Sequence, residues 1–135
     1  RAHKDGAFGF ARDAAAGISD ELADLRANIF VAAEEIGCAW VGEIFADRAY
    51  NPDGTLVDRS KPGAVLHDPV VAGPRIAAMV KARAILTEDG TRLPTRIDTI
   101  CLHGDGATAV AMAQAVRQTL EAEGITVRRF PVTGD

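Results

Sequence analysis

Aromatic residues make up only 5% of this 135-residue chain, and its apolar runs stay well short of the roughly 20 residues that span a bilayer. Positive charge is also scarce, since 15 Lys and Arg stand against 19 Asp and Glu for a net charge of −4. A chain with few rings to stack on bases and without a basic patch is not typical of nucleic-acid-binding proteins. The first residues, Arg1 to Asp5, lack the apolar stretch of a signal peptide, so we expect a cytoplasmic protein that is not bound to membranes.

Cysteine is nearly absent as well. The two that occur, Cys38 and Cys101, each fall in a segment that we predict as a core strand. Free cysteine often behaves as a small buried apolar residue, so we expect a reduced protein without disulfides. Hydrophobic residues make up 47% of the chain, which is typical of a globular domain. We therefore predict a single domain over residues 1–135, with residues 1–18 poorly defined because glycines interrupt them.

Hydrophobic periodicity and turn residues predict alternating helices and strands. Gly37 and Gly124 stand where glycines commonly end helices. The final strand–helix–strand order predicts a parallel sheet and an α/β fold. The expected elements, in chain order, are helix Asp20–Ile36, strand Cys38–Phe45, short strands at 55–57 and 64–66, a helix with Pro74 in its first turn, strand Ile97–Leu102, helix Ala107–Glu123 and strand Ile125–Phe130. The expected inward-facing helical residues are Ile76, Met79, Val80 and Ala84 in one helix and Val110, Ala113, Val116 and Leu120 in the next.

Charged residues gather at the end of the first predicted strand. Glu43 interrupts an apolar run, where a carboxylate must be paired, protonated or turned toward a polar cavity. Asp47 and Arg48 follow the strand, and Arg48 and Arg59 flank a Pro-Asp-Gly turn, so both guanidinium groups could face one anion. The alternative is a loop of structural ion pairs that contribute little energy.

A second polar cluster, His103-Gly104-Asp105-Gly106, lies between a predicted strand and the helix that follows it. Glycines at this position let a ligand approach the backbone, and free N–H groups at a helix start favour anions. His103 could act as a general base or metal ligand, and Asp105 could orient it or activate water. Alternatively, Asp105 caps the helix and His103 fills a half-buried position. We interpret His67-Asp68-Pro69 as a turn.

Four separated blocks of the sequence resemble the LamB/YcsF family. They are Glu43-Ile-Phe-Ala-Asp-Arg-Ala-Tyr50, Asp53-Gly54-x-Leu56-Val57-x-Arg59, Pro62-Gly63-Ala64-Val65 and Ile100-Cys-Leu-His-Gly-Asp105. The resemblance covers about residues 27–130. It implies the C-terminal part of an incomplete parallel β/α barrel with fewer than eight strands, related to polysaccharide deacetylases. It also implies a component of an ATP-dependent 5-oxoprolinase, which converts 5-oxoproline to L-glutamate together with two other subunits.

Histidine-containing motifs that family members carry early in their chains are missing here. We therefore expect this chain to correspond to the C-terminal half of such a family member and to be inactive alone. A half barrel leaves open strand edges, which favour association with partners or with a second copy of the chain.

The resemblance and the residue types lead to one chemical hypothesis. Phosphorylation of the lactam oxygen by ATP, bound here or by another subunit, would make the ring carbon a better electrophile. His103 or Asp105 would activate water, and Glu43 or Asp47 would position the ring nitrogen. Arg48 and Arg59, with the backbone at Gly104 and Gly106, would hold carboxylate or phosphate. Two alternatives are a metal-dependent hydrolase of the deacetylase type, whose metal ligands the sequence does not define, and a non-catalytic protein that only binds partners.

Overall fold

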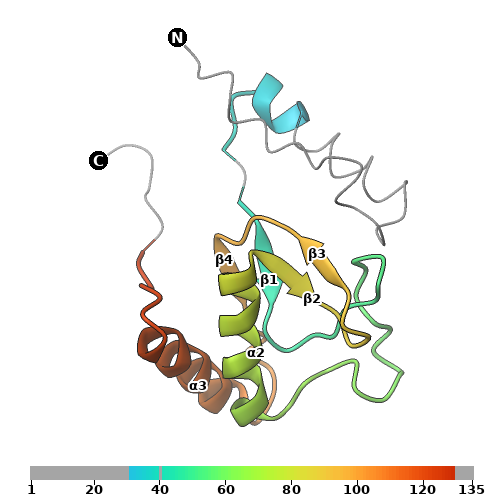
Figure 1. The fold of residues 1–135 in the computed structure, drawn as a ribbon, viewed down its shortest axis with the longest axis vertical. Coiled ribbons are helices and arrows are strands. Elements are labelled where there is room, and N and C mark those ends of the chain that lie inside the picture. The colour runs from blue at the N-terminus through green and yellow to red at the C-terminus, as the bar shows by residue number, and fades with distance from the viewer. Residues whose placement is uncertain (1–30, 40, 130–135) are drawn as a thin grey trace.

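The computed structural model describes residues 31–39 and 41–129, and these form a mixed α/β fold (Figure 1). The elements are β1 (Glu43–Phe45), α2 (Pro69–Ala82), β2 (Ala84–Leu86), β3 (Arg92–Pro94), β4 (Thr99–Cys101) and α3 (Ala109–Ala122). Strands β1 and β4 pair in parallel, which confirms the predicted parallel arrangement. Strands β2 and β3 form a separate antiparallel hairpin. Within the described residues, no helix combines the length and the apolar character needed to cross a membrane.

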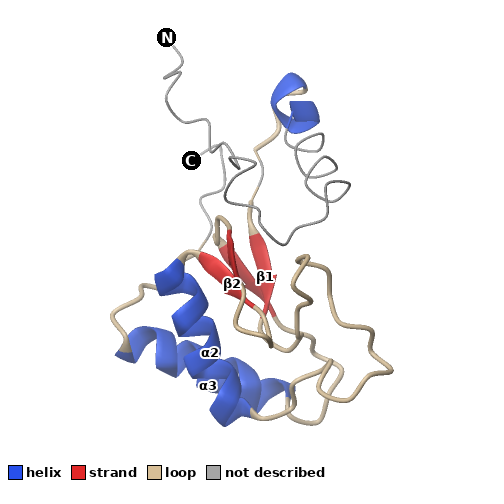
Figure 2. Cartoon of the chain, turned by 45° about the vertical axis from the view of Figure 1, so that its right-hand side comes forward, coloured by secondary structure: helices blue, strands red, loops and turns tan. Residues whose placement is uncertain are grey.

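One face of the β1–β4 pair is covered by the two helices. Ile44 in the middle of β1 is fully buried together with Ile76 and Met79 of α2, and Val116 and Leu120 of α3 join the same core. Burying a side chain of this size contributes about 1.5–3 kcal/mol. In Figure 2, α2 and α3 lie together on one side of the strands, and the long segment that follows β1 extends on the other. Because side chains alternate along a strand, Phe45 and Cys101 face away from the helices.

Helix α2 begins earlier than the sequence predicted. The Asp68 carboxylate accepts a hydrogen bond of 2.9 Å from the Val70 N–H, so Asp68 is the N-cap, and Pro69 takes the first helical position. The prediction of a turn at 67–69 with Pro74 in the first helical turn was therefore wrong, and Pro74 lies inside the helix. Gly73 allows α2 and α3 to approach closely, since a Cβ there would lie 2.4 Å from Thr119 Oγ1 and 3.0 Å from the Ala115 carbonyl.

The predicted helix Asp20–Ile36 lies mostly outside the described residues, but its end is present. Residues 31–35 are helical, and Gly37 follows in the left-handed conformation, with φ of 71°. The Gly37 N–H donates to Glu34 and the Cys38 N–H donates to Ala33, a pattern typical of helices that end in glycine. Gly124 ends α3 in the same way, with φ of 73°. Both glycine predictions are confirmed.

Several predicted extended segments are shorter in the structure. Strand Cys38–Phe45 reduces to Glu43–Phe45, and Cys38 is exposed rather than in the core. The predicted short strands at 55–57 and 64–66 contribute only isolated bridges, Tyr50 with Leu56 and Arg48 with Val65. Residues 125–129 form no strand, although Ile125 packs against the core.

The inward face of α3 also differs from the prediction. Val110 is 71% exposed and Ala113 is exposed, whereas Met112, Val116 and Leu120 are buried. The prediction counted Val110 as the first inward position, but burial begins at Met112 and repeats every four residues. In the preceding helix, Ile76, Met79 and Val80 pack inward as predicted, while Ala84 belongs to β2.

Candidate functional site

The register of β1 and β4 brings the two predicted polar clusters together. Glu43 pairs with Thr99 and Phe45 pairs with Cys101, so partners differ by 56 positions. Extending the same register by two residues places Asp47 beside His103. Asp47 Oδ2 lies 2.7 Å from His103 Nδ1, within hydrogen-bond distance. The shared rim that the sequence predicted for parallel strands is therefore present in the structure.

The imidazole of His103 is fixed on two sides. A carboxylate can only accept hydrogen bonds, so in its contact with Asp47 the Nδ1 atom carries the proton. The ring also stacks on Phe45, with ring centres 5.7 Å apart and planes 10° from parallel. In the neutral ring this arrangement leaves Nε2 with the free lone pair, which is the protonation state that a general base requires.

Asp47 is held firmly between strand β1 and the loop at 64–66. Its residue is 8% exposed, and its carbonyl oxygen accepts a hydrogen bond of 2.9 Å from the Leu66 N–H. The second carboxylate oxygen, Oδ1, is buried and has no hydrogen-bond partner among the described residues. Leaving a buried carboxylate oxygen without a partner costs about 1–3 kcal/mol or more.

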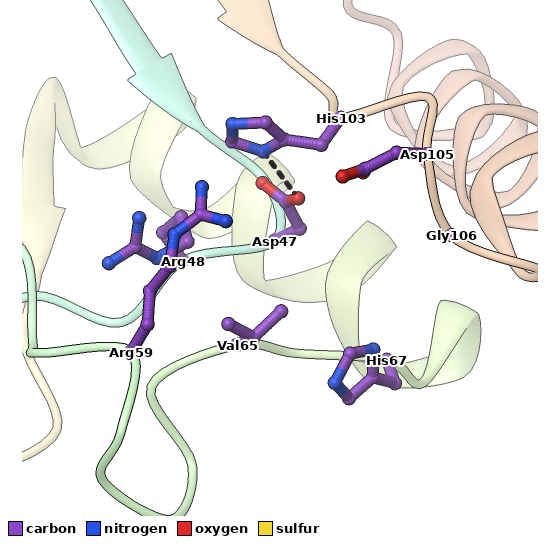
Figure 3. Close-up of a pocket in the computed structure, with 8 residues that line it drawn as sticks. All are labelled: Asp47, Arg48, Arg59, Val65, His67, His103, Asp105 and Gly106. Carbon is purple, nitrogen blue, oxygen red and sulfur yellow. Dashed lines mark hydrogen bonds and ion pairs between the residues drawn. The ribbon is translucent and has the colours of Figure 1, made fainter.

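A cavity of about 250 Å³ opens next to the Asp47–His103 pair (Figure 3). Its walls combine the segment after β1, the loop before α2 and the loop after β4. Two arginines, two histidines and two carboxylates reach it, so the lining offers charged groups of both signs to a small ligand. The lining residues are Asp47, Arg48, Arg59, Val65, His67, His103, Asp105 and Gly106.

The two predicted arginines have different surroundings. Arg48 is 6% exposed, and its guanidinium donates to the carbonyls of Ala64 and Val57 at 3.3 and 2.8 Å. Arg59 is exposed and extends across the cavity toward Asp47 and His103 in Figure 3. Arg48 therefore supports the loop that carries Arg59, and Arg59 is the guanidinium available to an anion in the cavity.

Only some of the remaining predicted site residues line the cavity. Asp105 is exposed, and its carboxylate points toward Asp47 in Figure 3. It does not cap α3, whose N-cap is Thr108 without a side-chain cap bond. Gly106 lines the cavity, while Gly104 does not. Glu43 is exposed at the opposite end of β1 from Asp47, outside the cavity, so the geometry separates it from the other candidates.

Phe45 and Val65 near the site were not singled out from the sequence, and His67 was interpreted as part of a turn in preference to a site role. Phe45 stacks on the His103 ring. His67 and Val65 line the cavity, and Val65 adds an apolar surface to it. A signal for Phe45 was present, because alternation along β1 puts it on the same side as Asp47.

Nearby Cys101 is a poor nucleophile, since burial raises the pKa of its thiol and the charges of Glu43 and Asp47 raise it further.

The described residues do not provide an evident metal centre. Over residues 31–39 and 41–129, no three His, Cys, Asp or Glu side chains lie close enough together to hold a metal ion. A catalytic zinc site commonly uses three protein ligands, and the His103–Asp47 pair supplies only two.

Comparison with known proteins assigns this chain to a family. The model of the LamB/YcsF family matches residues 16–134. This chain belongs to the LamB/YcsF family. The family assignment made from the four sequence blocks is thereby confirmed.

Among relatives, the A subunit of 5-oxoprolinase from Ruegeria pomeroyi is 65% identical over 99 residues, which cover 73% of this chain and 39% of that protein. The protein of the same name from Azorhizobium caulinodans is 52% identical over 99 residues, with the same coverage. The crystal structure of a lactam utilization protein from Thermus thermophilus superposes with a TM-score of 0.65 at 39% identity, covering 73% of this chain and 38% of that one. The chain thus spans about two fifths of the length of these relatives.

Proposed function

We propose that this chain provides part of the lactam-hydrolysing site of an ATP-dependent 5-oxoprolinase, which opens 5-oxoproline to L-glutamate. The observation that carries the proposal is the hydrogen-bonded Asp47–His103 pair facing a small cavity that Arg59 also reaches. Relatives named as 5-oxoprolinase subunits support the choice of substrate. Their names also support assembly with other chains, and we propose two partner subunits in the cytoplasm.

The dimensions and charges of the cavity suit the proposed substrate. A volume of about 250 Å³ lies just below the roughly 300–1,000 Å³ of typical ligand pockets, which favours a small five-membered ring. 5-Oxoproline carries one carboxylate, for which the Arg59 guanidinium is a suitable partner. Its ring N–H is a donor, and the Asp47 and Asp105 carboxylates that line the cavity are acceptors.

ATP itself does not fit the cavity beside Asp47 and His103. The cavity is small, two carboxylates line it, and the loop before α3 lacks the Gly-Lys-Ser/Thr ending of a phosphate-binding P-loop. We therefore assign nucleotide binding to a partner or to a part of the protein outside this cavity.

The chemistry of this chain is then water activation. His103 Nε2 accepts a proton from water as the oxygen attacks the ring carbonyl carbon. The Asp47 carboxylate holds the Nδ1–H and stabilises the imidazolium that forms, as the acid does in hydrolase triads. The C–N bond then breaks, and the ring nitrogen takes the proton back from the His103 imidazolium as it leaves. General-base catalysis of this type contributes roughly 10²–10⁴-fold to rates.

A chimera tests the proposal. The matched region of this chain replaces the corresponding region of the Ruegeria pomeroyi relative, and the product is assayed with the partner proteins of that organism. We expect ATP-dependent glutamate release, and we expect His103→Gln to lower kcat by roughly 10²–10⁴-fold. The control Arg117→Gln removes an exposed ion pair with Glu121, far along α3, and should retain full activity. Retention of activity within a few fold in His103→Gln would overturn the proposed role of His103.

A further inference from the structure

Arg75 of α2 makes an unusual set of contacts beneath the site. Its Nη2 donates to the Arg48 carbonyl at 2.9 Å, and its Nη1 lies 3.5 Å from the carbonyls of Phe45 and Ala46. The short bond to Arg48 is the strong one, and the two longer contacts are weak. Together they place a guanidinium under the backbone on both sides of Asp47.

The surroundings of Arg75 show that it is not a surface ion-pair residue. Among the described residues it forms no salt bridge, and its guanidinium carbon lies 5.9 Å from the ring centre of Tyr50. Burial lowers the pKa of the Arg75 guanidinium, an effect that the nearby Tyr50 and Glu88 partly oppose. Placing a cation in such a position costs desolvation energy, which its hydrogen bonds to carbonyls must offset.

The contacts converge on the turn that carries Asp47. The carbonyls at 45, 46 and 48 face Arg75, while the Asp47 carbonyl accepts from Leu66 on the other side. The Tyr50 hydroxyl accepts a hydrogen bond of 2.9 Å from the Phe45 N–H, which fixes the start of the same turn. Rotation of the backbone at residue 47 would break several of these contacts at once.

We propose that Arg75 is a positioning residue, which holds the turn at 45–48 so that the Asp47 carboxylate stays against His103 Nδ1. It does not line the cavity, so it acts through Asp47 and not on the substrate. The effect of Arg75 on catalysis rests on the proposed function. Its effect on the geometry of the Asp47–His103 pair does not depend on which substrate the site binds. Displacing a catalytic group by about 1 Å can cost 10²-fold in rate, so a distant arginine can matter to catalysis.

The test reads the state of the His103 ring directly. In the 135-residue chain, ¹⁵N NMR of the imidazole reports whether the proton sits on Nδ1 or Nε2. With Asp47 in place we expect the Nδ1–H form, because the hydrogen bond to the carboxylate selects it. In Arg75→Gln we expect the Nδ1–H share to fall and the Nε2–H share to rise. The control Arg117→Gln, also a helical arginine, should leave the ring signals unchanged.

A second variant covers the case in which Arg75→Gln does not fold. Arg75→Lys keeps the charge and the stem but has a single nitrogen, so it can hold the Arg48 carbonyl without spanning to 45 and 46. We expect a smaller shift in the same direction. Urea unfolding of each variant is measured in parallel. A folded variant with lowered stability but wild-type His103 ring signals would overturn the proposal, because a merely structural arginine predicts that result.

Activity in the chimera then separates the two proposals. We expect Arg75→Gln to lower kcat by roughly 10–100-fold with little change in KM, since the substrate-binding groups remain in place. If the parent chimera lacks 5-oxoprolinase activity, the proposed function fails, while the NMR result still decides whether Arg75 positions Asp47.

Discussion

Gly42 and Asp98 hold each other by a reciprocal pair of hydrogen bonds. The Gly42 N–H donates to Asp98 Oδ2 at 2.8 Å, and the Asp98 N–H donates to the Gly42 carbonyl at 2.8 Å. The two residues stand immediately before β1 and β4, so this pair fixes the register of the parallel strands. The same register brings Asp47 to His103 at the other end of the strands.

Gly42→Ala should therefore disturb both stability and the site. A Cβ at Gly42 would lie 2.1 Å from the Arg96 carbonyl oxygen, which is backbone and cannot rotate away. We expect a loss of about 1–3 kcal/mol in the free energy of unfolding, measured with urea. The control is Gly104→Ala, because a Cβ there meets nothing within 4 Å. Equal effects of the two substitutions would contradict the steric argument.

Asp68→Ala should destabilise helix α2. The substitution removes the carboxylate that accepts from the Val70 N–H, and losing such an N-cap costs about 0.5–2 kcal/mol. Thr108→Ala is the matched control, since Thr108 is the N-cap of α3 but makes no side-chain cap bond. Thermal unfolding of both variants checks the prediction, and a Thr108→Ala loss as large as that of Asp68→Ala would refute it.

Arg59→Gln should mainly change KM, whereas Arg48→Gln should mainly change stability. In the active chimera, Arg59→Gln removes the free guanidinium of the cavity, and we expect KM for 5-oxoproline to rise roughly 10–100-fold, as for a lost hydrogen bond to a charged group. Stability should hardly change, because Arg59 is exposed.

Arg48→Gln instead loses the bonds to Ala64 and Val57 and should lower the unfolding midpoint. Steady-state kinetics together with urea unfolding distinguish the two roles. A large KM effect from Arg48→Gln without loss of stability would reverse the assignment.

The turn at 51–55 should contribute stability that depends on pH. The Thr55 hydroxyl and then its backbone N–H, both bound to Asp53 Oδ1, lower the pKa of Asp53 below 3.8. A carboxyl whose pKa is lower in the folded state stabilises the fold above about pH 3.8, and this contribution is lost as the pH falls through the folded value.

The free energy of unfolding should therefore fall less steeply on acidification in Asp53→Asn than in the parent protein. Thr55→Val removes the hydroxyl, which lowers the Asp53 pKa most, and keeps the backbone N–H donor. The dependence of its unfolding free energy on pH should therefore be intermediate. Urea titrations between about pH 5 and pH 2.5 measure the slopes, and identical slopes in all three proteins would exclude this contribution.

The sequence predicted the proximity of Asp47 and His103 better than it predicted the element boundaries. Charge after two strands of a parallel sheet was enough to expect Asp47 and His103 on one rim, because parallel strands end at the same edge. The choice between Arg48 and Arg59 needed the structure, since it depends on carbonyls at residues 57 and 64 that no local pattern identifies. Arg75 gave no sequence signal, because an arginine on a helix is ordinarily a solvated residue.

The boundary errors have local physical causes. Asp68-Pro69 carried a helix-start signal, a side-chain acceptor followed by proline, whereas Pro74 follows Gly73, which has no acceptor; the prediction relied on the proline alone. Val110 was assigned inward because it is apolar, yet it lies in the first turn of α3 and is 71% exposed, and burial begins only at Met112. Cys38 was placed in the core because the apolar run containing it continues to Phe45, whereas pairing with β4 begins only at Glu43.

The cavity walls come from two kinds of structure, and these differ in how readily they accept substitutions. The base and its carboxylate are anchored to paired strands, while Arg59 belongs to an exposed loop. Under the proposed function, insertions or replacements in that loop would exchange the group that recognises the ligand and leave the water-activating pair untouched. Reaction type and ligand preference would then be modular, and libraries confined to residues 58–63 are the natural starting point for changing the ligand that the cavity binds.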